Sequence, residues 1–205
     1  MKISQKIITN LKSGGADFFL SVPCKLLANM ITILENDKNI YYSAIPREEE
    51  GMGICAGAYL GNKLPCIMMQ NTGIGNSVNS IVSLLQLYQM PVVFLISYRG
   101  TPGEPVGAQG GMASITEDLL NTLRIPMLHC NTEEDLDKIS TFTNHAKVIE
   151  SPVAVLCNFN LMKDLFIPLQ KKIGGDSGGH SGAAQWKGNQ KEKLVSKEIL
   201  KINIE

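Results

Sequence analysis

Between Arg47 and Leu60 the chain reads Arg-Glu-Glu-Glu-Gly-Met-Gly-Ile-Cys-Ala-Gly-Ala-Tyr-Leu, three carboxylates followed by very small residues. An apolar run at 40–45 precedes this stretch and predicts a β-strand. Carboxylates favour the first turn of a helix because they interact with the positive end of its dipole. Glycine costs about 1 kcal/mol in a helix interior relative to alanine, so the glycines indicate that another backbone or a ligand packs very close. A solvated acidic helix start is the simpler alternative.

Outside this stretch, apolar runs alternate with helical patterns along the chain. Strands are predicted at residues 17–22, 40–45, 65–69, 91–97, 125–130 and 152–157. Helices are predicted at about residues 3–11, 25–34, 48–60, 77–89, 115–123 and 133–147. The alternation predicts an α/β fold, an open and mainly parallel six-stranded sheet with helices on both faces.

Three unusual segments each follow a predicted strand: the acidic stretch, residues 70–79 and the long loop at 99–111. Ligands of such sheets bind at the carboxyl ends of the strands, so we expect these segments to converge on one edge. Residues 70–79 contain Gly-x-Gly-Asn in a predicted loop, which is a weak signal alone. Its glycines would let the backbone approach a flat or anionic ligand, and a bare tight turn is the alternative.

Composition excludes several classes of partner. The 19 basic and 19 acidic residues balance, so nucleic acid is not an expected partner. No apolar run approaches the roughly 20 residues of a membrane span, and the start of the chain shows no signal-peptide pattern. The five cysteines are scattered without Cys-x-x-Cys, which favours reduced thiols in the cytoplasm and no metal site in this chain.

The composition changes after Pro168. Residues 1–168 are predicted to form one ligand-binding domain, and residues 169–205 a glycine-rich linker with a possible short C-terminal helix. Two interpretations of residues 169–205 remain open: a tail without structure, and a segment that docks on a partner.

Three motifs occur together: the acidic stretch, Gln-Asn-Thr-Gly-Ile-Gly-Asn at 70–76, and Tyr-Arg-Gly at 98–100 followed by Ala-Gln at 108–109. In this order they resemble the pyrimidine-binding domain of thiamine-diphosphate-dependent 2-oxo acid decarboxylases. The likeness runs over about residues 3–160 and is closest to the α subunits of the sulfopyruvate decarboxylase family, with phosphonopyruvate decarboxylases next.

The resemblance implies a carboxy-lyase that converts sulfopyruvate to sulfoacetaldehyde and carbon dioxide in coenzyme M biosynthesis. Two alternatives stay open. One is the same chemistry on phosphonopyruvate, and the other is a non-catalytic α/β subunit that binds a regulatory ligand.

The same resemblance assigns roles to particular residues. A glutamate that lies nine residues before Gly57, Glu48, would hydrogen-bond the pyrimidine N1′ of thiamine diphosphate, and Glu49 would take this role if the register slipped by one. The cofactor would also contact Asn71, Thr72, Gly73, Gly75, Asn76 and Gln109. The anionic groups of a small 2-oxo acid would be held by Lys25, Arg47 and Arg99, since guanidinium groups bind such oxyanions bidentately.

The chain departs from the family at the magnesium site. The family's diphosphate domain carries Gly-Asp-Gly followed by a distant Asn, and this sequence has no such pair. The similar tripeptide Gly175-Asp176-Ser177 lies in the glycine-rich tail and does not substitute for the motif. The resemblance therefore implies a β subunit that binds Mg²⁺ and the diphosphate, a cofactor shared across the interface, and a hetero-oligomer.

Overall fold

The structure of the protein is a computed structural model that describes residues 2–162. The predicted linker and helix at 169–205, together with the boundary at residue 168, lie outside the described residues.

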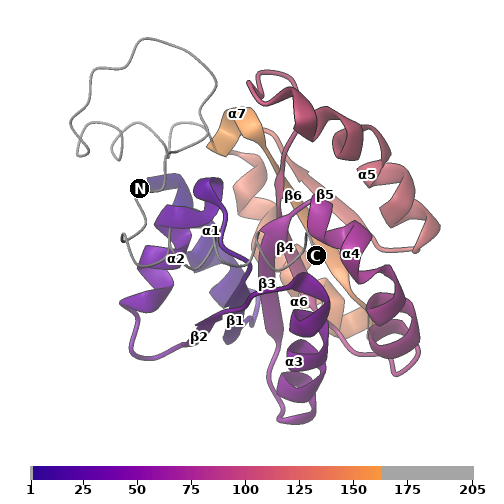
Figure 1. The fold of residues 1–205 in the computed structure, drawn as a ribbon. Helices are drawn as coiled ribbons and strands as arrows, with labels where there is room; N and C mark the ends of the chain where they lie inside the picture. Colours follow the sequence, from indigo (N-terminus) through magenta and orange to yellow (C-terminus); the bar gives the residue numbers. More distant parts are fainter. Residues whose placement is uncertain (1, 163–205) are drawn as a thin grey trace, which may run out of the picture. The chain divides into compact units, whose positions relative to one another are not determined.

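A six-stranded sheet in the order β2-β1-β3-β4-β6-β5 runs through these residues, and every neighbouring pair is parallel (Figure 1). Its strands are β1 (Phe18–Ser21), β2 (Tyr41–Ala44), β3 (Pro65–Gln70), β4 (Val93–Tyr98), β5 (Met127–Cys130) and β6 (Val153–Asn158). The predicted open parallel sheet is therefore confirmed, and all six predicted strands are present.

Helices cover both faces of the sheet (Figure 1). One face is covered by α1 (Lys2–Ser13), α2 (Ala28–Glu35), α6 (Ile139–Ile149) and the short α7 (Phe159–Met162). The other face is covered by α3 (Glu48–Leu60), α4 (Thr72–Ser80), the π-helical η2 (Ile81–Gln86) and α5 (Gly110–Thr122). Three 3-10 turns complete the described chain: η1 (Lys25–Leu27), η3 (Gly107–Gln109) and η4 (Asp135–Lys138).

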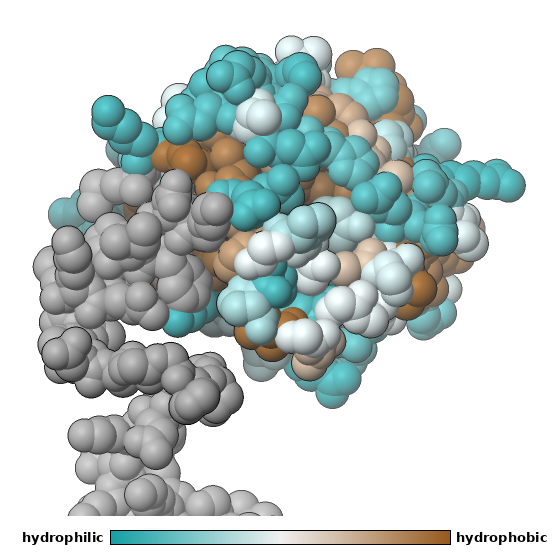
Figure 2. All heavy atoms as spheres, turned by 90° about the horizontal axis from the view of Figure 1, so that it is seen from above, coloured by the Kyte–Doolittle hydropathy of each residue, from teal (hydrophilic) through white to brown (hydrophobic). Residues whose placement is uncertain are grey.

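The two layers of helices explain the continuous apolar runs. Successive side chains of a strand point to opposite faces, so Phe19 joins the core beneath α1 and α2 while Leu20 joins the core beneath α3. All six residues of β4 are buried, as expected for a central parallel strand covered on both sides. On the side shown in Figure 2, hydrophobic residues reach the surface in patches between hydrophilic ones.

Two helices begin earlier than the sequence predicts. Helix α4 starts at Thr72 rather than near Ser77, so Gly73 and Gly75 lie in a helix and not in a loop. Helix α5 starts at Gly110 rather than near Ile115. Both starts are glycine-rich. At α4 the low helix propensity of glycine is overridden by the packing of Gly73 against Glu48, whereas a Cβ on Gly110 or Gly111 of α5 would meet nothing within 4 Å. Within the described residues no helix is both long enough and apolar enough to cross a bilayer.

Candidate active site at the carboxyl edge of the sheet

Glu48 is the first residue of α3 and rests against the first turn of α4. Arg47 before it is extended, with φ −144° and ψ 143°, so the helix begins at the glutamates as predicted. The Asn76 side chain donates a hydrogen bond from Nδ2 to Glu48 Oε2 at 3.3 Å. A Cβ added to Gly73 would lie only 2.5 Å from Glu48 Cγ. Gly73 therefore provides the space in which the Glu48 side chain lies.

The three adjacent glutamates differ in their surroundings. Glu49 forms an ion pair with Arg47, at 2.7 Å between Oε1 and Nη2, and Glu50 is exposed. Among these three, the structure places Glu48 against the small residues of α4. Glu48 thus contacts Gly73 and Asn76, whereas the carboxylate of Glu49 contacts the guanidinium of Arg47.

The glycines of α3 fall into two groups. A Cβ on Gly51 would collide with Ile45 and Ile67, so this glycine is needed for packing against the sheet. Cβ atoms on Gly53 and Gly57 would meet nothing within 4 Å. The outer side of α3 also carries Leu60, which is 75% exposed. Within the described residues, nothing therefore packs against the outer glycines of this helix.

Asn71 is fully buried and its side chain is occupied. Its Oδ1 accepts a hydrogen bond from the Arg99 backbone N–H at 3.1 Å, and its Nδ2 donates to the Arg99 carbonyl at 3.2 Å and to Thr116 Oγ1 at 3.0 Å. The Asn71 side chain thus fastens the end of β4 to the start of α4. A ligand contact of Asn71 would come from its backbone.

Arg99 lies at the end of β4 and is 13% exposed. Its guanidinium is bidentate to the Glu104 carboxylate, with 2.9 Å between Nη2 and Oε1, and Nη1 donates to Gln70 Oε1 at 3.0 Å. Hydrogen bonding to Glu104 raises the pKa of Arg99 above its usual value. Cys24 Sγ lies 3.9 Å from Nη1. Arg99 is therefore engaged inside the protein.

The remaining predicted residues lie around these two groups. Thr72 is the first residue of α4, and Gly75 on the same helix is near Met112. Lys25 and Arg47 are exposed and follow the paired ends of β1 and β2. Gln109 precedes α5, and its Oε1 is buried with no hydrogen-bond partner among the described residues.

Two groups of predicted residues are thus brought into contact. Glu48 meets Gly73 and Asn76, while Asn71 meets Arg99. The sequence did not identify Glu104 as the partner of Arg99. The available signal was that Glu104 is the single acidic residue of the 99–111 loop.

A second polar cluster lies beside the site, between α5 and the ends of β4 and β5. Tyr98 donates a hydrogen bond to Glu117 Oε1 at 3.1 Å, and His129 Nε2 lies 3.9 Å from Glu117 Oε2. Burial, followed by the charge of Glu117, raises the pKa of Tyr98 to about 12. These residues line a cavity of about 490 Å³.

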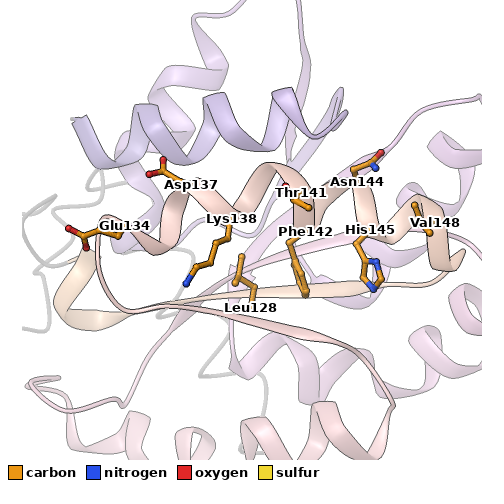
Figure 3. Close-up of a pocket in the computed structure, with 9 residues that line it drawn as sticks. All are labelled: Leu128, Glu134, Asp137, Lys138, Thr141, Phe142, Asn144, His145 and Val148. Atoms are coloured by element: carbon orange, nitrogen blue, oxygen red, sulfur yellow. The ribbon is translucent and has the colours of Figure 1, made fainter.

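A groove of about 820 Å³ lies elsewhere, along α6 and the edge strand β5 (Figure 3). Its lining includes Leu128, Phe142, His145 and Val148. It contains none of the residues predicted for the site. Among the described residues, no group of three or more His, Cys, Asp or Glu side chains is placed to hold a metal ion.

Known proteins resemble this chain in sequence and in fold. No protein-family model matches it. The sulfopyruvate decarboxylase subunit alpha of Methanocaldococcus jannaschii is 43% identical over 157 residues, which cover 76% of this chain and 93% of the relative. The same subunit of Methanococcus maripaludis is 38% identical over 157 residues, covering 76% of this chain and 94% of the relative.

More distant similarities agree with this relationship. A phosphonopyruvate decarboxylase of Streptomyces viridochromogenes is 35% identical over 116 residues, 56% of this chain and 29% of the relative. A 2-oxoglutarate:ferredoxin oxidoreductase structure from Magnetococcus marinus superposes with a TM-score of 0.59 at 15% identity, over 78% of this chain and 29% of that chain, and thus shares the fold. On the strength of the two subunit alpha relatives, the chain belongs to the sulfopyruvate decarboxylase α-subunit family.

Proposed function

We propose that this chain is the α subunit of a thiamine-diphosphate-dependent decarboxylase that converts sulfopyruvate to sulfoacetaldehyde and carbon dioxide. The observation that carries the proposal is the position of Glu48 between Gly73 and Asn76, with its carboxylate on the surface formed by α3 and α4. The names of the α-subunit relatives support the substrate.

The residues present fit a bound pyrimidine ring. Glu48 offers a carboxylate to a ring nitrogen. The buried Gln109 Oε1 has no hydrogen-bond donor among the described residues, and an N–H group of the ligand could be that donor. When bound, thiamine diphosphate supplies the carbon nucleophile and the electron sink for decarboxylation. Glu48 would hydrogen-bond the pyrimidine N1′ and hold a proton there, which is general acid–base work by a positioned carboxylate. Thr72, Gly73 and Gly75 would line the ring with little side-chain bulk, together with the Asn71 backbone and the Asn76 side chain.

The proposed partner is a β subunit that binds Mg²⁺ and the diphosphate. The name "subunit alpha" of the relatives supports a partner, and the outer side of α3 supplies a surface for it. Gly53 and Gly57 leave room for close backbone approach, and the exposed Ile54 and Leu60 beside them supply apolar area. We infer a hetero-oligomer in which the cofactor lies between the two subunits.

The substrate's anionic groups are proposed to bind basic side chains at the ends of β1, β2 and β4. Lys25 and Arg47 are exposed there, with Arg47 in an ion pair with Glu49, and we propose these two as contacts of the substrate. Arg99, the third residue predicted from the sequence, is bidentate to the buried Glu104 in the structure. We also propose that the protein acts in the cytoplasm, because its five cysteines are unpaired, as is usual in a reducing compartment. Coenzyme M biosynthesis is proposed on the substrate alone.

The test is turnover of sulfopyruvate and of phosphonopyruvate by the complex of this chain with its β partner, for the wild type and for Glu48→Gln. We expect faster turnover of sulfopyruvate, and a loss of about 100-fold or more in kcat for E48Q with folding intact. Preference for phosphonopyruvate would select the alternative substrate. Normal cofactor binding and turnover by E48Q would refute the assigned role of Glu48.

A further inference from the structure

The loop between β4 and α5, residues 99–109, is built around one carboxylate. The Glu104 side chain is only 3% exposed although it lies in a loop. It accepts hydrogen bonds from Nε and Nη2 of Arg99 and from the backbone N–H groups of Gly100 and Val106. A buried carboxylate requires such partners, because an unpaired buried charge costs several kcal/mol. The loop therefore wraps around the Glu104 side chain.

The two ends of this loop are in contact. Gly100 has φ +81°, and a Cβ there would collide with the carbonyl oxygen of Gln109. The backbone of Gly100 therefore lies directly against the backbone of Gln109. Gln109 is the residue that immediately precedes α5.

The far side of the loop is anchored independently of Glu104. The Phe159 N–H donates to Thr101 Oγ1 at 3.1 Å, and Asn160 Nδ2 donates to the Pro102 carbonyl at 2.9 Å. These bonds tie the loop to α7, which follows β6. Removal of the Glu104 charge should therefore loosen the inner part of the loop, next to Gln109, while residues 101 and 102 stay attached.

We propose that Glu104 is a positioning residue: through Arg99 and the loop amides it holds Gln109 in one place at the edge of the active site. This inference rests on the proposed decarboxylation and goes beyond it, because it assigns Arg99 an internal task. The anion-binding capacity of its guanidinium is used by Glu104 rather than by substrate.

The test compares Glu104→Gln with the wild type in the complex with the β partner. The substitution keeps the shape of the side chain but leaves Arg99 without its counter-charge. Amide hydrogen exchange at Gly100 and Val106 should become faster, and kcat should fall by about 10- to 100-fold because small misplacements of active-site groups have effects of this size. KM should change by less than about twofold.

Two further variants make the result specific. Glu104→Asp keeps the charge and protects folding, and it should show the same effects at smaller size because the shorter side chain cannot reach every donor. Asp137→Asn is the matched control, since Asp137 pairs with Lys6 at 2.8 Å but is 68% exposed. It should leave both loop exchange and kcat unchanged.

The possible outcomes separate the two proposals. A wild-type complex inactive on both acids would refute the proposed function, and with it the role of Glu104 in that reaction. With an active wild type, unchanged exchange at Gly100 and Val106 or an unchanged kcat in E104Q would overturn the role of Glu104. A lower KM in E104Q would also overturn it, because Arg99 would then act as a substrate receptor that Glu104 competes for.

Discussion

Gly73→Ala tests whether the Glu48 side chain packs against Gly73 as tightly as the structure indicates. The added methyl group would lie 2.5 Å from Glu48 Cγ and 2.9 Å from its Cδ and Oε1. These distances are well inside the van der Waals separation of 3.5–4.0 Å for carbon atoms. The side chain of Glu48 must therefore turn away, or helices α3 and α4 must move apart.

The magnitude follows from two opposing effects on the free energy of unfolding. Alanine in place of glycine stabilises a helix by about 0.5–1 kcal/mol, and overpacking costs about 1–3 kcal/mol. The lower end of the overpacking range, about 1 kcal/mol, applies here because the Glu48 side chain can rotate away from the added methyl group. Gly53→Ala is the matched control, since its Cβ would meet nothing within 4 Å. This variant gains the helix stabilisation by alanine without any overpacking cost.

Urea denaturation of the two variants measures this difference. We expect G73A to be less stable than G53A by about 1 kcal/mol. The double variant Glu48→Ala/Gly73→Ala should recover the steric part, because the side chain that collides is gone. Equal stability of G73A and G53A, or no recovery in the double variant, would refute the reasoning. In the complex, G73A should also lower kcat as the carboxylate is displaced.

Three further results are expected. Hydrogen bonds from Arg99 lower the pKa of Glu104 below its usual value of 4.5. Its contribution to stability is therefore present above about pH 4.5 and is lost as the pH falls through the lowered pKa. Acid titration followed by circular dichroism should show less loss of stability in this range for E104Q than for the wild type. Tyr98 has a pKa raised from 10.0 to about 12. Between these pH values Tyr98 ionises in the unfolded chain but not in the native state, so the free energy of unfolding falls. Tyr98→Phe should remove this fall, which urea melts at pH 9 to 12 would measure. Alkylation of the native protein followed by mass spectrometry should modify Cys24 first, because the other four cysteines are buried and burial raises the pKa of the Cys66 thiol; early labelling of Cys66 would contradict the described core.

The strands could be predicted because each central strand is buried on both faces and therefore reads as a continuous apolar run. The starts of α4 and α5 could not, because glycine normally interrupts helices. Gly73 is present for a tertiary reason, the space that Glu48 occupies, and this reason is visible only once the two helices are adjacent. A local sequence pattern does not carry that information.

The same distinction applies to the site. Glu48 was predicted through a motif with fixed spacing, and its role stays a prediction. The structure places Glu48 beside Gly73 and Asn76 and pairs Glu49 with Arg47. The pairing of Arg99 with Glu104 depends on the path of a loop, so the sequence offered Arg99 only as a candidate contact of the substrate. Burial of the Asn71 side chain was likewise set by its contact with the end of β4.

The outer side of α3 has a consequence for how much of this chain a cell can make. A chain synthesised without a partner presents Leu60, 75% exposed, beside the bare glycines to water, and exposed apolar patches of this kind promote association between copies. If the proposed β subunit binds the outer side of α3, balanced synthesis of the two chains would keep this surface covered. Excess α chain should therefore be the form that precipitates or is degraded.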